Sequence, residues 1–212
     1  MSPLPQELVD RWQHRSENGP GEGTVYWHIL LGDNAGLRSM AEKAHARLAK
    51  FSGLHQAPLR WFHITTLIAG STDEIEDSGM SRMLAEARAL LSDTAPIKVT
   101  FRRVLYHPEA IVLSVYPQGA LEPIHEAALA ATRAVTGRDG NISGCMQPWN
   151  PHVTLCYSTG TQPAEPIIAA LGKELPARQV TVQSLSLVVQ RGPERLWDWQ
   201  HIGTAHLAGS SA

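Results

Sequence analysis

Cysteine and long apolar runs are the two features that this sequence most clearly lacks. Cys145 and Cys156 are the only cysteines among 212 residues, too few for a disulfide framework or for a metal site built from cysteine alone. We expect both to be thiols. No stretch approaches the length of a membrane span, and residues 1–17 contain no basic segment followed by an apolar one. These absences predict a cytoplasmic protein without membrane contact.

An excess of charge of one sign is also missing. The formal net charge is -2, so the chain lacks the polycationic surface that holds long DNA or RNA through many phosphates. A small phosphate-bearing substrate remains compatible with this charge. The hydrophobic content of 43% and charged content of 18% are typical of a globular protein. The length suits one large domain or two small lobes that share a core.

Apolar residues along the chain alternate between strand spacing and helical spacing. We expect strands at residues 24–32, 60–67, 97–106, 110–117, 151–157, 180–190 and 195–203. We expect helices at residues 5–15, 37–51, 80–91, 121–135 and 167–175. Turn-forming residues join the third strand to the fourth and the sixth to the seventh, which predicts two antiparallel hairpins. Without a low-complexity linker, the pattern indicates an α+β or α/β domain.

The strand at residues 60–67 carries two polar residues, His63 and Thr65, within an otherwise apolar run. Successive side chains of a strand point to opposite faces, so His63, Thr65 and Leu67 are expected on one face. A lone inward histidine is usually a hydrogen-bonded core residue. One such pair therefore indicates no particular chemistry.

The same pattern recurs in the second half of the chain. His152 and Thr154 lie in the strand at residues 151–157, again with an aliphatic residue between them. Each of the two strands follows a predicted helix and precedes another. A repeat in matching contexts indicates an internally duplicated lobe and disfavours two unrelated core histidines.

The segments His63-Ile64-Thr65-Thr66 and His152-Val153-Thr154-Leu155 resemble the signature of the 2H phosphoesterases. This family includes bacterial RNA 2′,3′-cyclic phosphodiesterases, also called 2′-5′ RNA ligases. The resemblance covers residues 24–202. It implies an α+β, bilobal fold with pseudo-two-fold symmetry, in which two antiparallel sheets line a central cleft and helices lie outside.

The resemblance also implies how one bilobal domain, residues 1–212, is divided. Residues 1–23 would form an N-terminal helix and loop, residues 24–95 and 176–207 a terminal lobe, and residues 96–175 a central lobe. One sheet would contain the strands at residues 24–32 and 60–67 and the last hairpin. The other would contain the strands at residues 97–106, 110–117 and 151–157.

Paired histidines and threonines suit the opening of a 2′,3′-cyclic phosphate. One imidazole can take a proton from water while the other protonates the departing ribose oxygen on the opposite side of phosphorus. Each threonine hydroxyl can donate to a nonbridging phosphate oxygen. We therefore expect His63 and His152 to be catalytic and Thr65 and Thr154 to bind phosphate. All four groups are side chains, so the mechanism needs neither a metal ion nor another cofactor.

The predicted activity is metal-independent hydrolysis of a 2′,3′-cyclic phosphate or 2′-5′ phosphodiester of a nucleotide or RNA end, and it is compatible with reversible 2′-5′ RNA ligation. The alternative is a noncatalytic nucleotide- or RNA-binding module that retains the cleft. Two titratable imidazoles in matching positions favour the enzyme, because a binding module does not need them.

Other residues near the motifs are weaker candidates. His28 is compatible with substrate binding, because related proteins often place this strand position in the cleft, and equally with packing. Trp149 could stack a base from its loop or anchor the core, whereas core anchoring is favoured for Trp61. Strict alternation places Cys156 on the motif face as a buried thiol and Tyr157 on the opposite face.

Two apparent motifs lack the structural context that their usual function requires. Glycines within residues 19–23 precede a strand instead of opening a helix after one, which argues against dinucleotide binding. His125-Glu126 lacks the second histidine of a zinc protease.

Residues 145–151 offer no basic side chain to bind phosphate, whereas many 2H phosphoesterases have one at this place. The expected partner is thus a small cyclic nucleotide or an RNA terminus, bound by a monomer.

Overall fold

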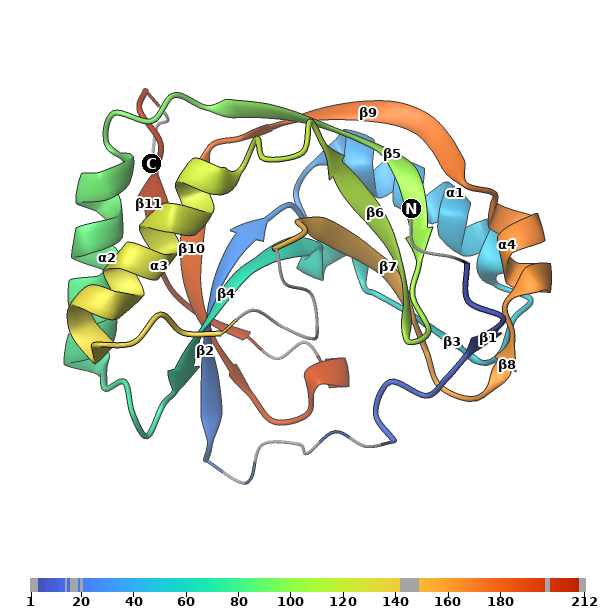
Figure 1. The fold of residues 1–212 in the computed structure, drawn as a ribbon, viewed down its shortest axis with the longest axis horizontal. Helices are drawn as coiled ribbons and strands as arrows, with labels where there is room; N and C mark the ends of the chain where they lie inside the picture. The colour runs from blue at the N-terminus through green and yellow to red at the C-terminus, as the bar shows by residue number, and fades with distance from the viewer. Residues whose placement is uncertain are drawn as a thin grey trace.

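The computed structural model describes residues 4–13, 15, 19, 21–141, 149–196 and 199–209 (Figure 1). Its strands are β1 (Glu7–Leu8), β2 (Gly23–Leu30), β3 (Leu54–Gln56), β4 (His63–Ser71), β5 (Ile97–Tyr106), β6 (Ala110–Tyr116), β7 (His152–Ser158), β8 (Gln162–Pro163), β9 (Glu174–Val182), β10 (Ser184–Arg191) and β11 (Trp199–His206). Its helices are α1 (Ala35–Leu48), α2 (Asp77–Leu91), α3 (Glu122–Thr136) and α4 (Glu165–Leu171), with short 3-10 helices η1 (Leu59–Trp61) and η2 (Glu194–Leu196).

Two antiparallel sheets form the frame of the molecule. The four-stranded sheet has the order β11-β10-β2-β4, and the five-stranded sheet has the order β3-β7-β6-β5-β9. Apart from β3, the second order repeats the first, with β7 in the place of β4 and β6 in the place of β2. The two motif strands therefore occupy equivalent positions, which confirms the predicted α+β fold with two related sheets.

The helices exchange sides between the two halves of the molecule. Helix α1 follows β2 but packs against β9 and α4, whereas α3 follows β6 but packs against α2 and β4 (Figure 1). Each of these helices thus covers the sheet that its preceding strand does not belong to. The predicted lobe ranges depart from this arrangement: β3 and α1 lie with the five-stranded sheet, although both fall within residues 24–95.

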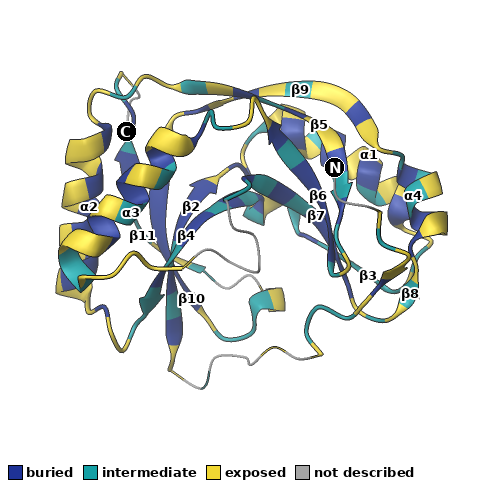
Figure 2. Ribbon diagram, viewed as in Figure 1, coloured by how far each residue is buried: buried dark blue, intermediate teal, exposed yellow. Residues whose placement is uncertain are grey.

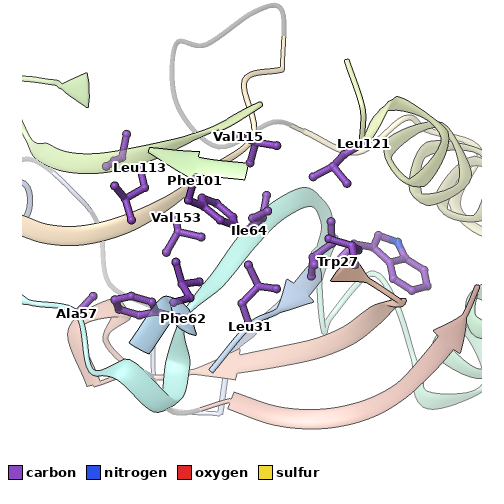
Figure 3. Packing of buried hydrophobic residues seen from close by; sticks show 14 of the residues in the cluster. Trp27, Leu31, Ala57, Phe62, Ile64, Phe101, Leu113, Val115, Leu121 and Val153 are labelled. Carbon is purple, nitrogen blue, oxygen red and sulfur yellow. The ribbon is translucent and has the colours of Figure 1, made fainter. Parts of the chain in front are cut away.

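Buried apolar side chains join the two halves into one core (Figures 2 and 3). Ile64 and Val153, the middle residues of the two H-x-T motifs, are 0% exposed and belong to the same buried cluster. Strands β4 and β7 also contact each other. Burial of one face of each motif strand leaves the polar residues on its other face, away from the core.

A β-bulge follows the first motif. Trp27 pairs with Leu67 and His28 pairs with Thr65, which leaves Thr66 as an extra residue in β4. A bulge reverses the alternation of side chains beyond it. Leu67 is therefore 0% exposed in the core, and its predicted position on the face of Thr65 was wrong.

An equivalent bulge follows the second motif. Ile111 pairs with Cys156 and Val112 pairs with Thr154, which leaves Leu155 as the extra residue in β7. Cys156 is consequently buried in the core, whereas Tyr157 lies on the motif face and lines the cavity described below. Strict alternation predicted the opposite for both residues and was wrong for the same physical reason.

Three predicted elements differ from the structure. In the described part of residues 5–15, the predicted helix is replaced by β1, which pairs with β8. Helix α4 ends at Leu171, before Gly172, whose φ of 82° favours glycine, so Leu175 lies in β9 instead of a helix. The predicted strand at residues 180–190 is divided: β9 pairs with β5, and β10 pairs with β2 and β11.

Candidate active site

The two motif histidines begin their strands with the same hydrogen bond. Nδ1 of His63 lies 2.8 Å from the carbonyl oxygen of Trp61, and Nδ1 of His152 lies 2.8 Å from that of Asn150. Because a carbonyl oxygen only accepts, each Nδ1 must donate, and the neutral ring keeps its lone pair on Nε2. Both rings are thereby fixed in the tautomer that exchanges protons through Nε2.

The four predicted motif side chains line one cavity between the sheets. Its volume is about 310 Å³, at the lower end of the range for small-molecule sites. His63 and Thr65 come from the four-stranded sheet, and His152 and Thr154 come from the five-stranded sheet. The fold thus brings together two pairs that are far apart in the sequence.

Burial lowers the pKa of both motif histidines. The pKa of His63 is lowered to about 4, mainly by burial, and the charge of His152 acts in the same direction against the hydrogen bond to Trp61. The pKa of His152 is lowered by burial, with the charges of His107 and Arg11 contributing. Both rings are therefore neutral at neutral pH, the state in which an imidazole can accept a proton.

Aromatic rings surround His63. The ring of His28 lies 4.2 Å from it between centroids, and the ring of Trp199 lies 4.5 Å from it at 90°. His28 is 2% exposed, lines the cavity, and has Nδ1 3.0 Å from the carbonyl oxygen of Trp27. It therefore faces the cavity and is packed at the same time, so the two predicted roles of His28 are compatible.

Trp149 connects the loop before β7 to the first motif. Its Nε1 donates to the carbonyl oxygen of Thr65 over 3.1 Å, and its ring stacks on His125 at 4.4 Å. Trp149 also lines the cavity. Trp61 packs against the core and has its ring 5.1 Å from that of Trp199. Trp149 thus fixes the position of Thr65 as well as offering a surface to a ligand.

Two tyrosines form part of the cavity wall beyond the threonines. Tyr26 stacks on His28 at 5.0 Å, and burial raises its pKa to about 12. Burial also raises the pKa of Tyr157, so both phenols are neutral near pH 7. Sequence reasoning did not single out Tyr26, although its position two residues before His28 on the same strand was a usable signal.

Basic side chains reach the cavity from the N-terminal segment. Arg11 and Arg15 line the cavity together with Glu109 and Glu194. The Arg11 guanidinium also lies 4.3 Å from the ring centroid of Tyr157. Sequence reasoning missed these residues because only the fold brings the N-terminal segment next to residues so distant in the chain.

The remaining predicted features lie away from the cavity. Cys156 is a free, buried thiol whose pKa is raised to about 12 by burial, and Cys145 lies outside the described residues.

Within the described ranges, no three histidine, cysteine or acidic residues are grouped as metal ligands would be. The part of the chain that the structure describes contains no helix long and apolar enough to cross a membrane.

An α+β fold with an H-x-T motif in equivalent strands of two related sheets, both facing one cavity, defines the class of 2H phosphoesterase folds. The sequence model of the 2′-5′ RNA ligase superfamily matches residues 37–194. The chain belongs to this superfamily. No curated protein matches the sequence.

Solved structures share the fold at low sequence identity. The protein TT0787 of Thermus thermophilus is 19% identical with a TM-score of 0.66, and the match covers 89% of this chain and 100% of the other. LigT of E. coli in its apo form is 13% identical with a TM-score of 0.63, over 88% of this chain and 98% of the other. The MHV ns2 PDE domain is 15% identical with a TM-score of 0.57, over 79% and 98%.

Proposed function

We propose that the protein is a phosphoesterase that opens a 2′,3′-cyclic phosphate, or cleaves a 2′-5′ phosphodiester, of a nucleotide or RNA end. The observation that carries this proposal is the convergence of His63, Thr65, His152 and Thr154 on one cavity from opposite sheets. A phosphodiester between them has an imidazole on each side of phosphorus, as an in-line displacement with acid-base catalysis requires. Membership of the superfamily supports phosphoesterase-type chemistry.

We assign the base role to His63 and the acid role to His152. Burial among the rings of His28 and Trp199 keeps His63 neutral, with its pKa at about 4, so its Nε2 is available to take a proton from water. His152 then gives a proton to the departing ribose oxygen. The anionic phosphate between the rings favours the protonated imidazole that this role needs. In 2′-5′ ligation a 5′-hydroxyl would take the place of water as the nucleophile that opens the cyclic phosphate, so His63 and His152 would keep these roles.

Thr65 and Thr154 would donate their hydroxyl hydrogens to the nonbridging phosphate oxygens, where negative charge grows during the reaction. Because acid, base and donors are all side chains, the proposed mechanism needs no metal ion. Treatment with EDTA should leave turnover unchanged. Loss of turnover in EDTA that a divalent cation restores would contradict this mechanism.

A nucleotide is the favoured substrate for two reasons. The cavity of about 310 Å³ is small and has aromatic walls from Tyr26, Tyr157 and Trp149, which suit a base and a ribose. The structurally similar LigT of E. coli has been solved in complex with 3′-AMP and with ATP. Both observations support a nucleotide ligand for this chain.

Direct assay of the purified protein tests the proposal. Adenosine 2′,3′-cyclic phosphate, a 2′-5′-linked dinucleotide and ADP-ribose 1″,2″-cyclic phosphate should each be incubated with the wild type and with a His63→Ala/His152→Ala variant. We expect turnover of at least one substrate by the wild type and none above background by the variant. Tight binding of 3′-AMP without any turnover would instead indicate a noncatalytic nucleotide-binding module.

A further inference from the structure

Arg11 connects elements of both sheets at one end of the cavity. Its Nε and Nη2 donate to the two carboxylate oxygens of Glu194 over 2.9 and 2.6 Å, and its Nη1 lies 3.3 Å from Oε2 of Glu109. Glu194 belongs to the connection between β10 and β11, and Glu109 belongs to the turn between β5 and β6. We call this group, Arg11 with Glu194 and Glu109, the Arg11 bridge.

Backbone hydrogen bonds hold the segment that carries Arg11. Val9 donates to the carbonyl oxygen of Pro108 over 2.8 Å, and the Arg11 amide donates to that of Ser158 over 3.0 Å. The Arg11 side chain is only 11% exposed. A two-pronged arginine–carboxylate pair on an anchored backbone has a defined geometry. The Arg11 bridge is therefore a fixed part of the cavity wall.

Strand register places the backbone of Glu109 and Glu194 beyond the threonines, on the side opposite to the histidines. On the five-stranded side, Thr154 pairs with Val112, and Glu109 lies three residues before Val112, a distance of roughly 10 Å along a strand. On the four-stranded side, Thr65 pairs with His28, which is four residues, or roughly 13 Å, from the pair that Thr24 makes with Gln190. Glu194 follows Gln190 in the chain.

This distance along the strand backbones is comparable to the length of one nucleoside. With a phosphate between the histidines and threonines, a ribose and base would lie between Tyr26 and Tyr157, and the Arg11 bridge would stand at the far edge of the base. An RNA chain that continued past the base in this direction would be blocked by the Arg11 bridge. The charged side chains of this wall also compensate one another, because Arg11 and Arg15 are paired with Glu109 and Glu194. They offer no excess positive charge to further phosphates.

We propose that the Arg11 bridge determines substrate length: it closes the cavity behind a single nucleotide and makes a cyclic mononucleotide the preferred substrate over an RNA chain. This inference rests on the proposed phosphoesterase activity. Arg11 and Glu194 act here as specificity-determining residues and take no part in the proton transfers.

Two substrates with the same reacting group test this inference. These are adenosine 2′,3′-cyclic phosphate and an RNA hexamer that ends in adenosine 2′,3′-cyclic phosphate. The ratio of their kcat/KM values should be measured for the wild type, Arg11→Met and Glu194→Gln. Arg102→Ala is the matched control, because Arg102 pairs with Glu174 on the surface, outside the cavity, and both side chains are more than half exposed.

The wild type should prefer the mononucleotide by at least about 10-fold, the scale of discrimination that a shaped pocket provides. Arg11→Met and Glu194→Gln should each reduce this preference by about 10-fold, and Arg102→Ala should leave it unchanged. Equal use of both substrates by the wild type, or a preference that survives in both bridge variants, would overturn the inference. Absence of turnover of both substrates by the wild type would instead contradict the opening of a 2′,3′-cyclic phosphate in the proposed function. Thermal unfolding of each variant identifies any that does not fold, and Glu194→Gln, which keeps the side-chain shape, then decides.

Discussion

The two motif histidines are held by the same kind of hydrogen bond but lie in different surroundings. Both donate from Nδ1 to the carbonyl oxygen two residues earlier. His63 is packed against the rings of His28 and Trp199, whereas the charges of His107 and Arg11 act on His152. The two imidazole rings are thus oriented alike but have different neighbours. Different neighbours are what one acid and one base acting on the same phosphate require.

A good leaving group separates the two roles. A 4-nitrophenyl phosphodiester of a nucleoside releases an anion that needs no proton, so it does not need the general acid. His152→Ala should therefore lose at least about 100-fold in turnover of the cyclic phosphate but much less with the aryl ester. His63→Ala should lose about as much with both substrates. If His63→Ala instead lost much less with the aryl ester, and His152→Ala lost as much with both substrates, His63 would be the acid and His152 the base.

The pH dependence of turnover follows from the lowered pKa values. Catalysis needs one neutral and one protonated imidazole, so kcat/KM should be bell-shaped, with limbs that belong to the coupled pair. Because burial lowers the pKa of both rings in the free enzyme, the optimum should lie on the acidic side of about pH 6.5, the ordinary histidine value. The kcat profile should lie at higher pH than that of kcat/KM, because bound phosphate favours protonation. Stopped or continuous assays from about pH 4 to about pH 9 measure both profiles, and a kcat/KM optimum above about pH 8 would contradict this account.

Among the structural elements, the motif strands show what sequence could and could not predict. Apolar periodicity located β2, β4, β5, β6 and β7, because a strand with one buried face repeats every two residues. The resemblance to the 2H phosphoesterases implied their grouping into two sheets. The bulges at Thr66 and Leu155 were not predictable in this way, because they are set by the register of the neighbouring strand. As a result, alternation worked up to each threonine and failed immediately after it.

Cysteine reactivity tests the bulge in β7. In a Cys145→Ser background, Cys156 should react with a thiol reagent in the native protein at a small fraction of its unfolded rate, because it is 0% exposed and burial raises its pKa to about 12. A Tyr157→Cys variant that also carries Cys145→Ser and Cys156→Ser should react far faster, since position 157 lines the cavity. Fast reaction of Cys156, together with slow reaction of the thiol introduced at position 157, would restore strict alternation and remove Tyr157 from the site.

At the scale of the whole molecule, the repeat of the H-x-T motif correctly indicated two related sheets. That the four motif residues lie together at one cavity could therefore be predicted. Arg11, Glu109 and Glu194 could not, because they lie outside the repeat and come together only through tertiary packing. The exchange of α1 and α3 between the two sheets could not be predicted for the same reason. Helical periodicity shows which face of a helix is apolar, but not which sheet that face packs against.

Buried neutral histidines make the fold sensitive to acid. The pKa of His28 is well below its ordinary value because of burial and the charge of His63. In the unfolded chain these rings take up protons below about pH 6.5, while the folded chain does not, so stability is present above that pH and is lost as the pH falls toward about 4. The urea midpoint should therefore fall between about pH 7 and about pH 5. His28→Phe should weaken this dependence, by at most about 1.4 kcal/mol per pH unit, whereas His201→Ala, an exposed site, should not.

The central claim is that His63 and His152 act on one phosphate, and a double-mutant cycle on turnover tests it most directly. The wild type, His63→Ala, His152→Ala and the double variant should be compared on the substrate that the wild type turns over, with thermal unfolding as the control for folding. Groups that serve one transition state are strongly non-additive, so the double variant should be no more than about 10-fold slower than the slower single variant. If the two losses multiply, or if a folded His152→Ala variant keeps full activity, the two histidines do not share a phosphate.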